Sequence, residues 1–414
     1  MRAGESPPHI LYMTLKNKGE KDMKKALSFI LVLTLVFGST SVIFADSAQT
    51  ASSPAFTFSG EEIKLSLDEA IERMTTTGPA FESVMLTKDG NDAAARGQFE
   101  AIKAIEEARD QYKALTPEQQ AALGGVSVPS LNSLTGKQAT LAKEYYKNYS
   151  PIAYEAGING IKNQTIQAYY GLLMSQENYR IASESTDIKK TLLDNTKKKF
   201  DLGVASKMDV LQAENAYLSA QQAEAEALTS LTTVRMQTNM ALNYDTLQNL
   251  TLTDSLTLVT APSIDLDSAI ESALTNRADV MQAKYNMDNA ELEFNSVKAY
   301  PKNSATYMGA QASFQGQKLA YDTKLTSVEI EIRQAYMELE DLKKAVDVAQ
   351  STYENAKEAA RLTQLQYDTG MCTLTDLQTA QNNSSAAQLG VYSAITNYDL
   401  AVYSFEYNSK AGIL

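Results

Sequence analysis

Small apolar and aromatic residues recur every three or four positions in the last third of the chain. From Val328 to Tyr367 the spacing alternates between four and three residues, which is the 3.5-residue period of a left-handed coiled coil. A similar stripe runs from Ala387 to Phe405. Because the stripes are rich in Ala and Tyr rather than Leu, the helix backbones can approach closely. The pattern predicts a mainly α-helical protein with few or no β-strands.

Two long helical hairpins are expected. The first consists of residues 158–201 and 207–243, and the second of residues 325–368 and 374–409. Neither hairpin contains a proline, and both are rich in Ala, Gln, Glu, Lys and Leu, which favour helix over other structures. Each pair of helices is predicted to form an antiparallel coiled coil.

The chain contains an internal duplication. Phe200–Asn215 aligns without a gap with Tyr367–Asn382 at an offset of 167 residues, and Leu67–Glu72 aligns with Leu266–Glu271 at an offset of 199. The first half therefore carries 32 extra residues, located between about 100 and 160. A unit of this length is too long for a solenoid repeat. We predict a pseudo-two-fold protomer.

The duplication sets the domain organisation. Residues 61–250 form the first repeat, 251–263 an inter-repeat linker and 264–414 the second repeat. At the first of these boundaries, Leu250–Leu252 and Leu256–Leu258 alternate apolar and polar positions. This alternation predicts a short strand pair that links the two halves.

The amino-terminal residues carry an export signal. Met23 is followed by two lysines and a mostly apolar run of 12 residues. A cleavage site after Ala45 has a small residue at position −1 and the aliphatic Ile43 at position −3. Residues 23–45 are therefore predicted to be a secretory signal peptide, preceded by an over-extended start (1–22) and followed by a linker (46–60). An uncleaved anchor helix is the alternative, but the apolar run is shorter than the ~20 residues that a span needs.

The composition excludes most catalytic chemistry. The chain has one Cys and one His, and that histidine, His9, lies upstream of the signal peptide. This removes histidine general bases, Ser-His-Asp arrangements, zinc sites and disulfide frameworks from the exported protein. The net charge of −13 argues against nucleic acid as a partner. We expect no enzyme activity, no cofactor and no metal.

The turns of the two hairpins have the same chemistry at aligned positions. A glycine lies where a helix C-cap requires a positive φ angle, a hydroxyl residue can cap the returning helix, and an aspartate follows in its first turn. The aligned pairs are Gly203 and Gly370, Ser206 and Thr373, and Asp209 and Asp376. The simplest interpretation of the two aspartates is helix capping and compensation of the helix dipole.

The ordered set of motifs resembles the TolC-type outer-membrane efflux proteins (outer membrane factors). It comprises the export signal, the duplication, the opening Leu65–Ala70, the stretch Asn276–Asp279 and a Tyr/Phe-x-x-Gly-x5-Asp turn in both repeats. The stretch Asn276–Asp279 has Ala where the family has Pro. The resemblance extends over roughly residues 60–414.

This resemblance implies a homotrimer whose hairpins form a tapering α-helical barrel. The tunnel would conduct exported solutes passively, as the exit duct of a tripartite system. Its partners would be a membrane-fusion adaptor protein and, through it, an ABC or proton-driven inner-membrane pump. The protein would be exported to the cell envelope. The location would be the outer membrane and periplasm, or an extracytoplasmic position in a single-membrane envelope.

The resemblance also assigns roles to residues of the two turns. Asp376 matches a position where some relatives carry an acidic pore constriction, whereas Thr379 does not support a second acidic ring. A salt link that some relatives make is absent, since Cys372 replaces its basic residue; Cys372 is read as a small, half-buried turn residue. A contact between Tyr367 and Asp209 of a neighbouring hairpin is expected. The adaptor-contacting turns would be Leu202, Gly203, Val204, Thr369, Gly370 and Met371.

The lysine run before the first turn has two possible interpretations. Lys197, Lys198 and Lys199 could contribute to docking of the adaptor, or they could form a solvated helix end. The second interpretation needs no partner.

Membrane strands are not evident in either half. A spanning strand needs ~9–11 residues with alternating apolar positions. The segments available are 116–151 and Tyr300–Leu325, and their alternation is poor. We therefore predict that the β-barrel of the family is much reduced or missing. The alternative function is a non-conducting, secreted coiled-coil protein of the envelope with a structural or interaction role.

Overall fold

The computed structural model describes residues 57–123, 130–260 and 265–414. The predicted over-extended start, the signal peptide and residues 46–56 of the linker after it lie outside the described residues, as do residues 261–263 of the inter-repeat linker.

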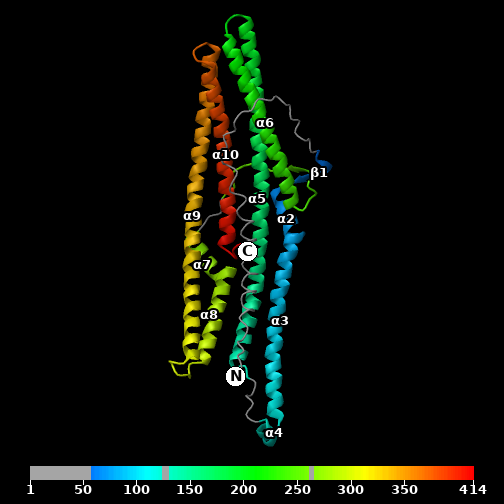
Figure 1. Cartoon of the computed structure of the whole chain (residues 1–414), viewed down its shortest axis with the longest axis vertical. Coiled ribbons are helices and arrows are strands. Elements are labelled where there is room, and N and C mark those ends of the chain that lie inside the picture. Colours follow the sequence, from blue (N-terminus) through cyan, green and yellow to red (C-terminus); the bar gives the residue numbers. More distant parts are fainter. Residues whose placement is uncertain (1–56, 124–129, 261–264) are drawn as a thin grey trace, which may run out of the picture. The chain divides into compact units, whose positions relative to one another are not determined.

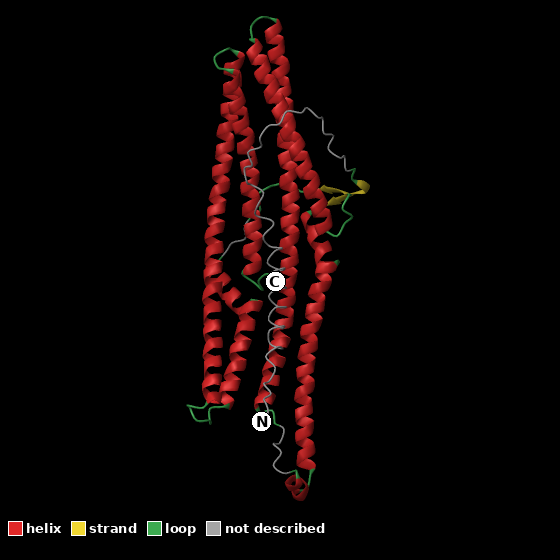
Figure 2. Ribbon diagram, viewed as in Figure 1, coloured by secondary structure: helices red, strands yellow, loops and turns green. Residues whose placement is uncertain are grey.

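Helices account for most of the described chain (Figures 1 and 2). In chain order the elements are β1 (Ser59–Leu65), α2 (Leu67–Thr76), α3 (Pro79–Ala114), α4 (Pro117–Ala122), α5 (Leu134–Asp201), α6 (Lys207–Ala241), β2 (Gln248–Leu252), α7 (Leu266–Asn276), α8 (Ala278–Ser296), α9 (Ala305–Asp368) and α10 (Leu374–Asn408). The predicted mainly α-helical class with few strands is confirmed for these residues. None of these helices has the length and apolar character needed to cross a membrane.

The order of helices repeats. Elements α2, α3, α5 and α6 of the first half correspond to α7, α8, α9 and α10 of the second. Helix α3 has 36 residues and α8 has 19. The extra residues of the first half therefore lie in the second part of α3, in α4 and in the connections around it.

Both long helices begin earlier than the sequence analysis predicted. Helix α5 begins at Leu134 rather than 158, and it continues through Pro151. Helix α9 begins at Ala305 rather than 325, after Ser304, whose Oγ accepts a hydrogen bond from the Tyr307 amide at 3.2 Å. Proline removes one backbone donor, but a helix of 68 residues retains enough other bonds to continue. Residues 305–325, in which the sequence shows no evident membrane strand, are thus helical.

The four long helices pack in the order α9, α10, α5, α6. Each hairpin is held by contacts between its own two helices, and α10 of the second hairpin packs against α5 of the first (Figure 1). Near the turns these contacts come from a cluster of buried apolar side chains, which we call the junction cluster. It consists of Leu192, Leu193, Ala213, Leu374 and Leu377, with Tyr217 and Tyr367 against it.

Away from the turns, shorter helices cover the long ones. Helix α3 packs along α5, α8 packs along α9, and α5 also contacts α8. At the α5–α8 contact, the rings of Tyr145 and Tyr285 stack with centroids 4.1 Å apart. The Tyr145 hydroxyl donates to Oε1 of Gln282 at 2.6 Å, so the buried ring keeps a polar partner.

The strand prediction for the linker was half right. Residues Gln248–Leu252 do form a strand, β2, but its partner is β1, which runs parallel to it. Leu256–Leu258 is not a strand. Parallel pairing with a distant segment cannot be found from local alternation alone. Asp254, just after β2, accepts hydrogen bonds from the Leu67 amide and the Tyr169 hydroxyl, both at 2.7 Å, which ties this region to α5.

Candidate functional site: the paired helical tips

The turns of the two hairpins have the same backbone geometry. Gly203 and Gly370 have φ angles of 74° and 75°. In the first turn, the amide of Val204 donates to the Lys199 carbonyl at 2.9 Å. In the second, the amide of Met371 donates to the Gln366 carbonyl at 2.7 Å. Both are Schellman C-caps, which satisfy the last carbonyls of α5 and α9 and require a positive φ at the glycine.

The returning helices begin with capping boxes. In α6, Oγ of Ser206 accepts from the Asp209 amide at 3.1 Å, and Asp209 Oδ2 accepts from the Ser206 amide at 2.8 Å. Thr373 and Asp376 repeat this exchange in α10 at 3.2 and 2.9 Å. The predicted capping role of both aspartates is confirmed. The hydrogen bonds from Thr373 hold the pKa of Asp376 below its ordinary value.

The outer rim of each turn is apolar and exposed. Leu202 is 79% exposed, Val204 73% and Met371 73%. Thr369 takes the place of Leu202 in the second turn, and its hydroxyl donates to the Leu365 carbonyl at 3.0 Å. In many Schellman motifs the residue after the glycine packs against the last turn of the helix. Here that turn offers Lys199 and Gln366, so Val204 and Met371 face solvent instead.

Tyr367 joins the two hairpins within one chain. Its hydroxyl is 3.4 Å from Oγ1 of Thr196 on α5. Lys199 Nζ lies 4.3 Å from the centroid of its ring. Asp209, by contrast, is engaged with Ser206. The expected contact between Tyr367 and Asp209 of a neighbouring hairpin stays a prediction for the assembled protein.

Lys199 has a role that sequence reasoning missed. It belongs to a lysine run, yet it is half-buried against an aromatic ring, whereas Lys197 and Lys198 are exposed. Cys372, at the same tip, is half-buried. Its Sγ lies 3.5 Å from the Thr363 carbonyl oxygen, and burial raises the pKa of its thiol.

The two outer helices of the layer carry exposed apolar side chains. On α6 these are Met208, Leu211, Leu218, Leu228 and Met240; on α9 they are Met308, Leu319, Ile330, Met337, Val348, Leu362 and Leu365. Among the described residues, no large apolar side chain on α10 is exposed. The outer helices thus bury one apolar stripe within the chain, such as Val328, Ile332 and Leu339 of α9, and carry further apolar side chains that are exposed.

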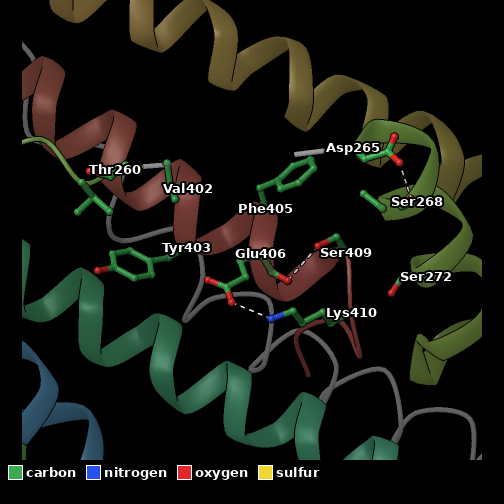
Figure 3. A pocket seen from close by; sticks show the side chains of 12 residues that line it. Thr260, Asp265, Ser268, Ser272, Val402, Tyr403, Phe405, Glu406, Ser409 and Lys410 are labelled. Carbon is green, nitrogen blue, oxygen red and sulfur yellow. Dashed lines mark hydrogen bonds and ion pairs between the residues drawn. The ribbon is translucent and has the colours of Figure 1, made fainter. Parts of the chain in front are cut away.

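A cavity of about 460 Å³ lies between α7 and α10. Its charged groups are already paired, as Figure 3 shows: Lys410 Nζ is 2.7 Å from Glu406 Oε1, and the Ser268 hydroxyl donates to Asp265 at 2.6 Å. Within the described parts of the chain, no cluster of side chains suits a metal ion. The paired tips therefore remain the best candidate site.

One part of the chain is similar to a known protein family. Residues 136–242, which include most of α5, the first tip and α6, match the sequence model of the family described as outer membrane efflux protein. No curated protein sequence matches the chain significantly. The predicted resemblance to the TolC-type efflux proteins is confirmed by this match. It also agrees with the expectation that the protein is not an enzyme, because the family consists of ducts.

Solved structures match over most of the chain. The Campylobacter jejuni CmeC outer membrane channel aligns with a TM-score of 0.64 at 14% identity, over 83% of this chain and 85% of that one. VceC, an outer membrane protein from Vibrio cholerae, aligns at 0.61 and 13%, over 84% and 97%. The open state of the Neisseria gonorrhoeae MtrE outer membrane channel aligns at 0.60 and 16%, over 84% and 89%. These likenesses confirm the predicted fold of long antiparallel hairpins.

Proposed function

We propose that this protein is the passive exit duct of a tripartite export system, assembled as a homotrimer in the cell envelope. The observation that carries the proposal is the position of the exposed apolar side chains. Among the four long helices, most of them lie on α6 and α9, which are the two edges of the four-helix layer. A contact that buries α6 of one copy against α9 of the next is heterologous. Repetition of such a contact closes into a ring of three when each copy is rotated by a third of a turn relative to the last.

The tips supply the second part of the proposal. Both turns present a rigid backbone with exposed apolar side chains, Leu202, Val204 and Met371. Exposed apolar residues on a fixed scaffold are typical of surfaces that bind another protein. The partner proposed is a membrane-fusion adaptor, which in turn would contact an ABC or proton-driven pump. Asp376 is proposed to line the narrow end of the tunnel, which would conduct solutes without catalysing a reaction.

Co-purification with the cognate adaptor tests this function. V204D combined with M371D places charges on both turns, and adaptor recovery should fall at least tenfold. L86D is the matched control, because Leu86 is 72% exposed on α3, which belongs neither to a tip nor to the α6 and α9 edges. Equal loss with both variants, or unchanged recovery with V204D and M371D, would contradict the assignment of the tips.

One observation favours the alternative of a non-conducting envelope protein. Residues 305–325, which make up most of the segment available for membrane strands in the second half, are helical and belong to α9. Conductance separates the two functions. A duct reconstituted in bilayers should pass ions through trimer-sized pores, whereas a structural protein should bind partners without any conductance.

A further inference from the structure

A cavity of about 530 Å³ lies among α5, α6 and α10, between the tips and the middle of the hairpins. Most of its lining residues are polar, three are alanines, and Lys189 of α5 is the single charged side chain among them. Around it are amide and hydroxyl groups, including Gln212 and Asn215 of α6 and Gln378 and Asn382 of α10. No carboxylate belongs to this lining.

Lys189 is buried without a counter-charge. Lys189 is only 4% exposed, and its Nζ donates a hydrogen bond to Oε1 of Gln381 at 2.9 Å. Within the described chain, no carboxylate oxygen lies within ion-pair distance of this nitrogen. Arg277, by contrast, contacts Asp279 and Glu331, each at 3.0 Å. An ammonium has three donors, so Lys189 has hydrogens to spare.

The orientation of Gln381 is fixed by a second bond. Its Nε2 donates to Oε1 of Gln364 on α9 at 3.4 Å, so its oxygen stays directed to Lys189. This chain of bonds across α5, α10 and α9 holds the ammonium in place. A neutral amide oxygen satisfies one N–H, but it does not balance the charge.

A second donor in the cavity is also unsatisfied. Gln378 Nε2 is buried, and it has no hydrogen-bond partner among the described residues. Such a group costs about 1–3 kcal/mol unless a ligand or water completes it. The cavity therefore combines one unbalanced positive charge with a surplus of N–H donors. A ligand that complements it must bring one negative charge and at least two acceptor oxygens.

We propose that this cavity binds a small organic carboxylate. Lys189 Nζ supplies the counter-charge, and the Gln378 amide supplies a second hydrogen bond to the carboxylate oxygens. The remaining amides and hydroxyls suit a polar body, such as that of an amino acid or a sugar acid. A phosphate dianion fits less well, because it would bring two charges to one cation.

The loss of stability that comes from burying the charged Lys189 supports a functional role for this residue. Burial lowers the pKa of Lys189 to about 8, which means that the protein keeps this group charged at neutral pH at the expense of stability. Perturbed groups of this kind, located in a polar cavity, are typical of binding sites. Carboxylate binding would return the charge balance that the fold itself does not provide.

Isothermal titration of the full chain tests the proposal. Acetate, glutamate and gluconate are the probes, measured at constant ionic strength against chloride and inorganic phosphate. At least one carboxylate should bind more tightly than either inorganic anion. K189M should weaken that binding at least tenfold and Q378L about threefold. K190M is the matched control, since Lys190 is the exposed neighbour on the same helix, and it should change affinity less than twofold.

Three outcomes would overturn the proposal. Equal affinity for phosphate or chloride would show a site that is not selective for carboxylates. Unchanged binding in K189M would remove the lysine from the site. Absence of binding, together with altered oligomerisation of K189M, would show that a carboxylate from another copy occupies the cavity. If K189M does not fold, the effect of Q378L decides the matter, because it leaves the charge in place.

Discussion

Lys199 of the first hairpin lies over the ring of Tyr367 of the second, with Nζ 4.3 Å from the ring centroid. This contact, with the adjoining Thr196, connects the tips of two hairpins that are 167 residues apart. The two turns are therefore positioned as a pair rather than as independent loops.

Truncation of Tyr367 should loosen that pair. Y367A removes the ring from the junction cluster and from Lys199, and we expect about 2 kcal/mol of local destabilisation. Y367F loses only the hydroxyl contact, at about 0.5–1 kcal/mol. Hydrogen exchange around residues 196–200 and 365–368 measures this. Y367A should accelerate exchange by more than tenfold and Y367F by much less; equal effects would argue against packing of the ring as the main contribution.

The tip glycines should be sensitive to alanine for a conformational reason. A Cβ at Gly370 would meet nothing within 4 Å, so the cost of G370A comes only from its φ of 75°, at about 1–2 kcal/mol. G309A is the matched control within α9, where a Cβ also meets nothing. It should stabilise the helix by about 0.5–1 kcal/mol. Denaturant unfolding of both variants should show opposite signs; a stabilising G370A would refute the argument.

The helix caps behind the tips should contribute measurably. S206A and T373A each remove a capping hydroxyl, and each should cost about 0.5–2 kcal/mol. S351A removes a hydroxyl of similar exposure from the middle of α9, where it bonds only to the Asp347 carbonyl. That control should be neutral or slightly stabilising. Urea unfolding monitored by circular dichroism distinguishes the two classes, and comparable losses in all three variants would count against a specific capping effect.

Because of Lys189, the protein should become more stable as the pH rises into the alkaline range. Its pKa is lowered from 10.5 to about 8 in the folded chain, so between these values the unfolded chain binds more protons. The free energy of unfolding should therefore rise as the pH increases from about 8 to about 10.5, by at most ~3.4 kcal/mol. K189M should be more stable at pH 7 and should lose this rise. Unfolding of both forms across this pH range provides the measurement. A rise of the same size in K189M would assign it to other groups.

The tips were predictable from the sequence because their chemistry is local. Glycine at the positive φ, the capping hydroxyl and the following aspartate all lie within a few residues of one another. The start of α5 was not predictable in this way, since Pro151 resembles a helix boundary and only packing against α3 and α8 extends the helix past it. The partner of β2 was not predictable either, because β1 is distant in the sequence and the two strands meet only in the folded chain.

The cavity of Lys189 depends on relations between helices. Its lysine lies on α5, and the amides that surround it come from α6 and α10. Which faces of these helices meet is decided by the junction cluster and by the register of α10 against α5. A heptad pattern describes a single helix and does not show which of its faces another helix covers. The pattern alone therefore cannot show whether Lys189 is buried or exposed.

The central claim is that the edges α6 and α9 of separate copies associate into a closed ring of three. Multi-angle light scattering of the purified protein, with detergent subtracted, tests it most directly. One processed chain has a mass of at most 45.3 kDa. The account predicts a measured protein mass three times that of one processed chain, and this mass should not change with protein concentration above the micromolar range. A mass equal to a single chain across that range would contradict the account.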